Sequence, residues 1–272
     1  MGKMTEEDRL MRRINQRFMK GVMNYRLIEE GDRILVGLSG GKDSLALLEL
    51  LARRSRIYKP KFSVVAAHVV MKNIAYESDQ TYLREYAESL GVPYVCYETE
   101  FDPSTDTRKS PCFLCSWNRR KALFTVAKEQ GCNKIALGHH YDDVIETILM
   151  GMLYGAQIQT MMPKLHSTNF EGMELIRPLY LVREDAIKAW RDYNDLHFIQ
   201  CACKFTDTCT TCNNEENQSK RMETKELIAR LKKVNPYVEG NIFKSVENVN
   251  LDTIVAYKQK GVKHHFLDEY DR

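Results

Sequence analysis

A short stretch of the chain carries the residues of a phosphate-binding loop. Residues 36–44 read Val-Gly-Leu-Ser-Gly-Gly-Lys-Asp-Ser, between an apolar run from Ile34 and a leucine-rich run from Leu45. Glycines let backbone N–H groups approach an anion because no Cβ intervenes. The N-terminus of a following helix adds partial positive charge, and Lys42 adds a full one. The pattern predicts a phosphate site between a buried strand and a helix.

The spacing of this loop differs from that of a Walker A loop. Three residues separate Gly37 from Gly41 instead of four, and Asp43 stands where the magnesium-binding Ser or Thr would be. Residues 39–44 instead resemble the pyrophosphate loop of enzymes that split ATP between its α- and β-phosphates. An ordinary glycine turn with Asp43 as a helix cap is the alternative, but the matching strand and helix favour the phosphate site.

Two adjacent acids follow another predicted strand. Asp142 and Asp143 come after Gly138-His-His at the start of a predicted helix. Ligands bind at the carboxyl ends of parallel strands, so these acids are placed to bind magnesium near the phosphate loop, with Asp43 as a second candidate. Helix capping explains the same acids equally well.

Six of the eight cysteines are grouped, which in a reducing compartment favours metal binding or catalysis over disulfides. Cys112 and Cys115 stand at i and i+3 near a helix start, so we expect both thiols on one side. A redox pair, a zinc site completed by two later cysteines, and an iron–sulfur site all fit. The later cysteines are Cys201, Cys203, Cys209 and Cys212. Cys96 and Cys132 stand singly in apolar surroundings and are expected in the core.

Strands and helices alternate along the first part of the chain. We predict strands at 34–38, 62–70, 92–97 and 134–137, with helices at 45–58, 78–90, 112–130 and 144–153. This order predicts an α/β fold, a parallel sheet with helices on both faces. A hairpin at 161–177 and helices at 183–193 and 214–234 follow. Residues 258–272 show no clear period and are expected to form a surface segment.

The N-terminal region is basic and amphipathic. No acid occurs between Arg9 and Arg26, while Leu10, Ile14, Phe18 and Val22 recur every four residues. This pattern predicts a helix with a basic outer face. Such a face can hold an RNA backbone or simply face solvent, and these residues do not decide between the two.

Length and composition give the domain organisation. The chain has 272 residues and a net charge of +3, and its apolar runs are far shorter than the roughly 20 residues that cross a bilayer. With no apolar signal segment at the N-terminus, we expect a cytoplasmic protein without a membrane partner. We expect a basic helix at 1–30, an ATP-binding α/β domain at 31–200, and a cysteine-rich segment with a small helical C-terminal extension at 201–272.

Several segments together resemble the tRNA-cytidine 2-sulfurtransferase family of PP-loop ATP pyrophosphatases. They are residues 39–44, Cys112-Phe-Leu-Cys115, the run from Lys134 to Thr147, Met162-Pro-Lys-Leu165 and Arg177-Pro-Leu179. The similarity covers roughly residues 10–200. It implies an enzyme that uses ATP, Mg²⁺ and a [4Fe-4S] cluster to transfer sulfur to cytidine 32 of tRNA. A sulfur donor such as cysteine desulfurase is the second implied partner, and a homodimer is compatible with the family.

The resemblance also implies the site residues. Cys112, Cys115 and Cys212 match the cluster ligands. The family's compact Pro-Cys-x-x-Cys is replaced here by a longer segment, in which Cys203 is the runner-up and a separate zinc is an alternative role for the extra cysteines. Lys42 and Asp43 are the catalytic candidates. The nucleotide-binding candidates are Ser39, Gly40, Gly41, Lys42, Asp43, Ser44, His68, Gly138 and Asp142.

The implied mechanism activates the base with ATP. The base oxygen attacks the α-phosphate, pyrophosphate leaves, and sulfide then displaces AMP. Two other functions stay open at this point. One is a PP-loop ligase or amidotransferase that acts on tRNA or a small molecule and needs no cysteine ligands. The other is a non-catalytic nucleotide-binding redox sensor, which would bind ATP without releasing pyrophosphate.

Overall fold

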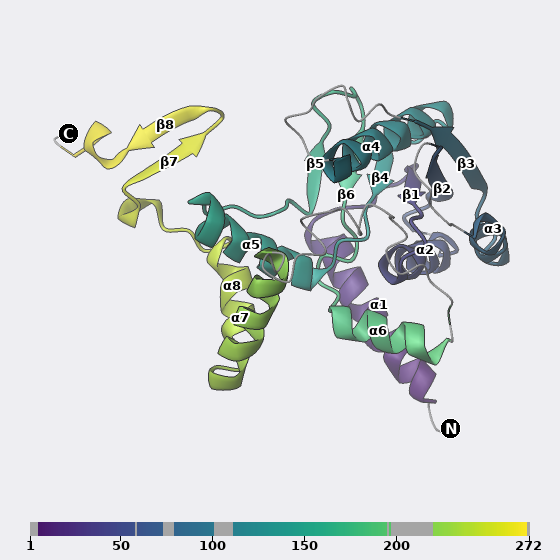
Figure 1. The fold of residues 1–272 in the computed structure, drawn as a ribbon, viewed down its shortest axis with the longest axis horizontal. Coiled ribbons are helices and arrows are strands. Elements are labelled where there is room, and N and C mark those ends of the chain that lie inside the picture. Colours follow the sequence, from purple (N-terminus) through teal and green to yellow (C-terminus); the bar gives the residue numbers. More distant parts are fainter. Residues whose placement is uncertain are drawn as a thin grey trace.

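A six-stranded sheet forms the centre of the molecule (Figure 1). The computed structural model describes residues 5–57, 59–72, 79–100, 111–194, 196 and 220–270. The strand order is β3-β2-β1-β4-β6-β5, and every neighbouring pair is parallel except β5–β6 at one edge. The bounds are β1 (Arg33–Gly37), β2 (Ser63–Met71), β3 (Tyr94–Thr99), β4 (Lys134–Ala136), β5 (Lys164–His166) and β6 (Glu174–Ile176). The predicted parallel sheet and the hairpin predicted at 161–177 are confirmed, and the hairpin forms one edge of the sheet.

Helices cover both faces of this sheet, as the alternation predicted. Leu35 of β1 packs in a core with Phe124 of α4 (Pro111–Glu129), whereas Ile34 and Val36 belong to the core on the opposite face. Strands buried on both faces have no polar side, which explains their continuous apolar runs. The second face is covered by α1 (Glu6–Asn24), α2 (Lys42–Ser55), α3 (Gln80–Ser89) and α6 (Glu184–Tyr193).

The N-terminal helix has the predicted amphipathic character. In α1, Ile14, Phe18 and Val22 are buried in the core that also contains residues of α2 and α6. The intervening residues Arg12 and Arg17 are exposed. Of the two single cysteines expected in the core, Cys132 is buried but Cys96 in β3 is only partly buried.

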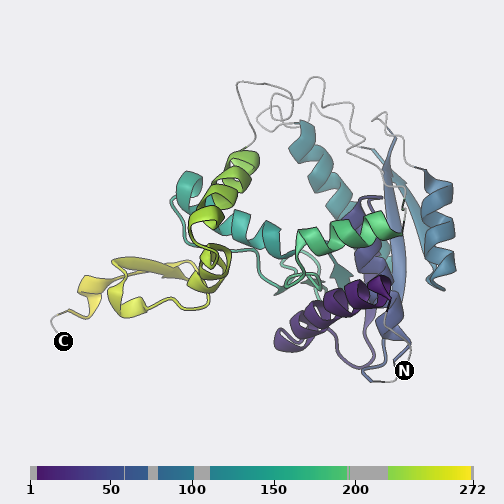
Figure 2. The same ribbon diagram turned by 90° about the horizontal axis from the view of Figure 1, so that it is seen from below.

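The C-terminal extension contains a hairpin as well as helices, which corrects the sequence expectation. Helices α7 (Lys220–Val234) and α8 (Val238–Ser245) pack against α5 (Tyr141–Gly155). Strands β7 (Ala256–Gln259) and β8 (Val262–His265) then form an antiparallel hairpin that stands away from the sheet (Figures 1 and 2). Lys260 and Gly261 have φ values of 50° and 83°, the left-handed conformation at both turn positions that favours a two-residue hairpin.

No helix within the described residues has the length and apolarity needed to cross a bilayer.

Candidate active site

The glycine-containing loop has the geometry of an anion cradle. It follows β1, and Gly40 adopts a φ of 81°, which favours glycine. The Ser44 hydroxyl donates to the Gly41 carbonyl oxygen at 2.8 Å and lies 3.2 Å from the Ser39 hydroxyl. Helix α2 begins at Lys42 without a side-chain cap at Gly41. The N–H groups of Lys42 and Asp43, the first two of the helix, have no intrahelical acceptor and are available to an anion held over the loop, whereas the Ser44 N–H donates to the Gly41 carbonyl oxygen.

A pocket at the carboxyl ends of β1, β2 and β4 adjoins this loop. It is lined by Ser39, His68, Gly138 and Arg119, among others. The His68 side chain is buried, and its Nδ1 lies 2.7 Å from the carbonyl oxygen of Leu38. A carbonyl oxygen only accepts, so this nitrogen carries the proton. Burial lowers the pKa of His68, and nearby Arg119 lowers it further, so the pocket wall presents a neutral imidazole.

Gly138 lets β4 end directly against the start of α2. A Cβ at this position would lie 3.3 Å from the backbone carbon and oxygen of Asp43. That separation is tighter than an ordinary van der Waals contact, and the opposing atoms are backbone that cannot rotate away. The predicted nucleotide-binding residues Ser39, Lys42, Asp43, His68 and Gly138 therefore come together at one edge of the sheet.

Lys42 forms a hydrogen-bonded ion-pair network with two carboxylates. Its Nζ lies 2.9 Å from Asp43 Oδ2 and 3.2 Å from Glu184 Oε1. Burial lowers the pKa of Lys42, but Asp43 and Glu184 outweigh this and raise it overall. Glu184 also lies 3.2 Å from Lys188 Nζ and 3.5 Å from Lys225 Nζ. Despite the opposing effect of burial, these cations lower the pKa of Glu184 to about 2.

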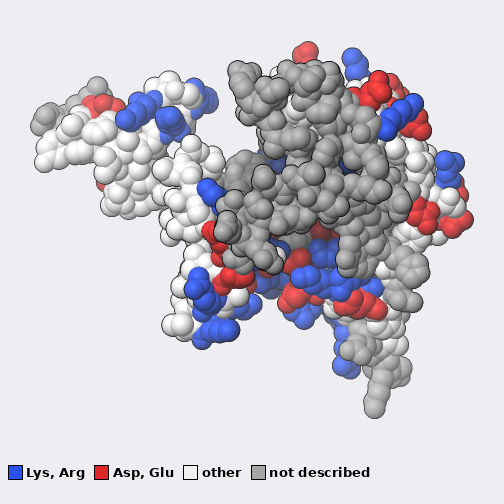
Figure 3. Space-filling view, viewed as in Figure 1, with Lys and Arg blue, Asp and Glu red and all other residues white. Residues whose placement is uncertain are grey.

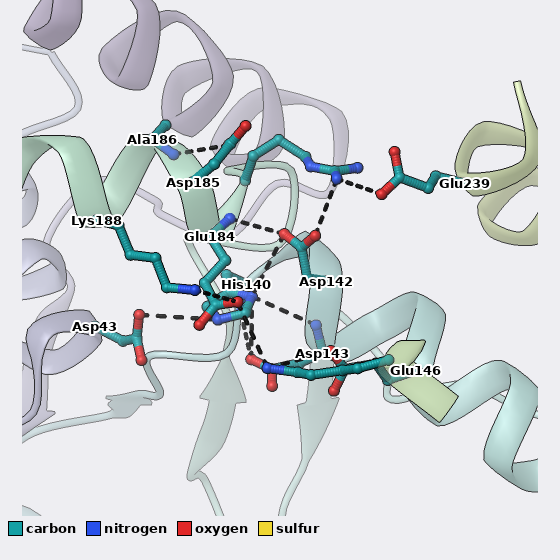
Figure 4. Close-up of polar contacts among 12 residues, drawn as sticks. Asp43, His140, Asp142, Asp143, Glu146, Glu184, Asp185, Ala186, Lys188 and Glu239 are labelled. Atoms are coloured by element: carbon teal, nitrogen blue, oxygen red, sulfur yellow. Dashed lines mark hydrogen bonds and ion pairs between the residues drawn. The ribbon is translucent and has the colours of Figure 1, made fainter. Parts of the chain in front are cut away.

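Of the two acids after His140, Asp143 caps α5, which was one of the two predicted roles. Asp143 Oδ2 accepts from the His140 N–H at 2.9 Å, and the Asp143 N–H donates back to His140 Nδ1, completing a capping box. Asp142 Oδ1 pairs with Arg183 at 3.0 Å, and its Oδ2 accepts from the Glu184 N–H at 2.7 Å (Figure 4). Asp142 therefore also fixes the start of α6.

Magnesium binding by Asp43, Asp142 or Asp143 stays a prediction. Within the described residues, no three His, Cys, Asp or Glu side chains are grouped as a metal site. Asp43 is the most exposed of the three paired carboxylates, at 30% against 17% for Asp142 and 18% for Glu184. Both of its oxygens contact the Lys42 ammonium, so a cation bound at Asp43 would share this carboxylate with Lys42 or displace it.

Helix α7 brings two cations to this cluster. Arg221 lies 3.0 Å from Asp143, and Lys225 lies 3.6 Å from Glu146. Glu146 is 3% exposed, and burial raises its pKa to about 7 although Lys225 and Arg221 oppose the shift. The helix that follows the cysteine-rich segment is thereby attached to the edge of the sheet where the loop lies.

The described cysteine of the Cys-x-x-Cys pair lies beside the pocket. Cys115 is buried in a cluster with Val69 and Met71 near the carboxyl end of β2. Arg119 of the pocket wall follows Cys115 by four residues in α4, so the two share one helix face a single turn apart. Cys112 lies within α4. Its side chain and the Cys201–Cys212 segment lie outside the described residues.

Sequence reasoning missed Glu184, Arg183, Arg119 and Lys225. The acids at the start of the 183–193 helix have the pattern of ordinary helix capping, and nothing in their spacing shows that α6 begins beside the start of α2. Arg119 stands four residues after Cys115. Extending the helix predicted at 112–130 by one turn from Cys115 would have placed Arg119 on the same helix face as Cys112 and Cys115.

Comparison with known proteins identifies the family to which the loop and the pocket belong. A family model for the PP-loop domain matches residues 7–207. The tRNA-cytidine(32) 2-sulfurtransferase of Alkalilimnicola ehrlichii is 35% identical over 244 residues, covering 88% of this chain and 74% of the relative. The enzyme of the same name from Geotalea uraniireducens is 34% identical, covering 92% of this chain and 98% of the relative.

A solved structure shares the fold. The U34-tRNA thiolase NcsA from Methanococcus maripaludis, determined with its [4Fe-4S] cluster, superposes with a TM-score of 0.68 at 22% identity. The match covers 89% of this chain and 78% of NcsA. With the loop, the strand-end pocket and these relatives together, the chain belongs to the tRNA-cytidine(32) 2-sulfurtransferase family of PP-loop proteins.

Proposed function

We propose that this protein uses ATP to activate C2 of a tRNA pyrimidine, cytidine 32, and replaces its oxygen with sulfur. The observation that carries the proposal is the position of Cys115, one helical turn from the pocket that adjoins the phosphate loop. Nucleotide chemistry and a thiolate-bound sulfur carrier would then share one edge of the sheet. The names of the curated relatives supply the substrate.

In the activation step, the base oxygen attacks the α-phosphorus and pyrophosphate departs. The backbone N–H groups of Gly40 and Gly41, with the hydroxyls of Ser39 and Ser44, would hold the departing pyrophosphate. Lys42 would neutralise its growing charge, which requires that its ammonium be held over the loop. Glu184 supplies that restraint from α6, because its carboxylate contacts Lys42 from outside the loop.

In the second step, sulfide adds to C2 and AMP leaves with the former base oxygen. We assign Cys112, Cys115 and Cys212 as ligands of a [4Fe-4S] cluster, which would supply an iron with an open position for sulfide. Magnesium at Asp43, with Asp142 nearby, would neutralise phosphate charge. His68 and Gly138 also line the nucleotide pocket. His68 contributes an uncharged imidazole, and Gly138 has no Cβ, which lets the start of α2 pack close to the end of β4.

The basic face of α1 is the proposed contact for tRNA phosphates. Arg12, Arg13 and Arg17 are exposed on this helix, whereas its apolar residues are buried in the core. An exposed row of cations suits an RNA backbone. Sulfur would come from cysteine desulfurase or another donor.

The test is tRNA-dependent release of pyrophosphate together with mass spectrometry of the product nucleosides. Lys42→Ala and Asp43→Ala should each abolish pyrophosphate release, because one lost charge-stabilising contact costs about 3–4 kcal/mol of barrier. Exposed Lys61→Ala is the matched control and should retain activity. Normal turnover in either loop variant would contradict the site. Pyrophosphate release without a thiolated nucleoside would point to the ligase alternative.

A further inference from the structure

The C-terminal hairpin encloses a groove that the proposed chemistry does not use. The groove has a volume of about 700 Å³ and lies between hairpin β7–β8 and the turn at 155–159 that follows α5. The hairpin stands away from the α/β body in both ribbon views (Figures 1 and 2). A two-stranded sheet alone is at best marginally stable in water, so a partner on this surface would stabilise it.

The charge of the groove wall is positive. Lys258 and Lys263 line the groove and are direct cross-strand partners in the β7–β8 register. Like charges directly opposite each other destabilise a strand pair, and neither lysine forms an ion pair with any described residue. No acid occurs between residues 253 and 267. Figure 3 shows basic side chains gathered along the hairpin lobe. Bound phosphates would remove the repulsion between the two lysines.

The rest of the lining suits a nucleic acid better than a small anion. Ile158, Leu251 and Ile254 give apolar surface, and Gln157 and Gln159 add amide groups. Amide groups beside paired cations suit the 2′-hydroxyl and phosphate groups of an RNA backbone. Tyr257 also lines the groove and is stacked on its cross-strand partner His264 with ring centroids 4.8 Å apart.

The groove and the candidate active site occupy opposite ends of one helix. Helix α5 starts at the acid cluster and ends at the groove turn, and its 15 residues span about 22 Å. A folded RNA whose target base reaches the strand-end pocket can extend over this length.

We propose that this groove binds the sugar–phosphate backbone of the tRNA substrate, with Lys258 and Lys263 contacting phosphates. The inference rests on the proposed function and adds a second RNA contact, separate from α1. The hairpin thus contacts the tRNA outside the anticodon loop. Removing its two groove lysines should weaken tRNA binding and leave ATP binding unchanged.

The test compares two double variants with equal charge change. Lys258→Glu/Lys263→Glu alters the groove, and Lys61→Glu/Lys128→Glu alters exposed lysines on the α/β body. Affinity for tRNA is measured by fluorescence anisotropy at several salt concentrations, with ATP binding measured on the same preparations. The groove variant should bind tRNA at least tenfold more weakly, with a log–log salt slope reduced by about 1.4–1.8 for two lost phosphate contacts. ATP affinity should be unchanged.

Three outcomes would overturn the inference. The groove variant could bind tRNA like the wild type, or the control variant could lose as much affinity as the groove variant. Sedimentation velocity could instead show that the groove variant converts a dimer to a monomer, which would make this surface a contact between two copies of the chain. Wild-type protein that binds tRNA but never thiolates it would contradict the proposed function and leave the groove assignment standing.

Discussion

Two glutamates of one ion-pair cluster should respond in opposite directions to the same substitution. Glu184 contacts Lys42, Lys188 and Lys225, and its pKa is lowered to about 2. Glu146 is buried beside Lys225, and its pKa is raised to about 7. Glu184→Gln removes a carboxylate that the fold stabilises in its charged form. Glu146→Gln removes one that the fold stabilises in its neutral form.

The magnitude follows from proton linkage. From the reference value of 4.5, each pKa moves by roughly 2.5 units, and each unit is worth about 1.4 kcal/mol. The contribution of Glu184 is present above pH 4.5 and is lost as the pH falls toward 2. For Glu146 the favourable contribution is complete below pH 4.5 and is lost as the pH rises through 7. At pH 8, Glu184→Gln should lower the unfolding free energy by about 3 kcal/mol, and Glu146→Gln should raise it by up to about 3 kcal/mol.

The assay is urea unfolding of both variants and the wild type at pH 4.5 and pH 8. The wild-type m-value should be retained, so that the midpoint alone reports stability. The Glu146→Gln gain at pH 8 should vanish at pH 4.5, because wild-type Glu146 is then protonated in the folded state. Destabilisation of both variants to the same extent at both pH values would refute the electrostatic argument and leave only lost packing.

Two further variants test other parts of the site. Gly138→Ala should raise the KM for ATP at least tenfold in pyrophosphate-release assays, because the added Cβ would push α2 away from β4. An unchanged KM would show that the backbone at Asp43 can move enough to accommodate the methyl group. Arg12→Glu, Arg13→Glu and Arg17→Glu combined should weaken tRNA binding and flatten its salt dependence. Isothermal titration should show ATP affinity unaltered in that triple variant, and normal tRNA binding would make α1 a solvated face.

Local patterns were enough to predict the sheet, the loop and the basic helix. Buried strands, glycine turns and four-residue apolar spacing act over a few neighbouring residues, so they can be read without the fold. The contact of Lys42 with Glu184 could not be predicted, because it depends on the first residues of α6 and α2 lying side by side although they are far apart in the sequence. The terminal hairpin was missed because its strands have only four residues each and its turn is Lys260-Gly261, without the Asn or Asp that usually signals such a turn.

The most direct test of the central claim is nucleoside mass spectrometry of tRNA treated with anaerobically purified protein, ATP, Mg²⁺ and a sulfur donor. We predict 2-thiocytidine with the wild type and none with Cys112→Ala, Cys115→Ala or Cys212→Ala, each of which should also bleach the absorbance of an iron–sulfur cluster. Cys132→Ala, at a buried core position, should retain both. Absence of thiolated product with the wild type, or one zinc held by four cysteines in place of iron, would contradict the sulfur-transfer account.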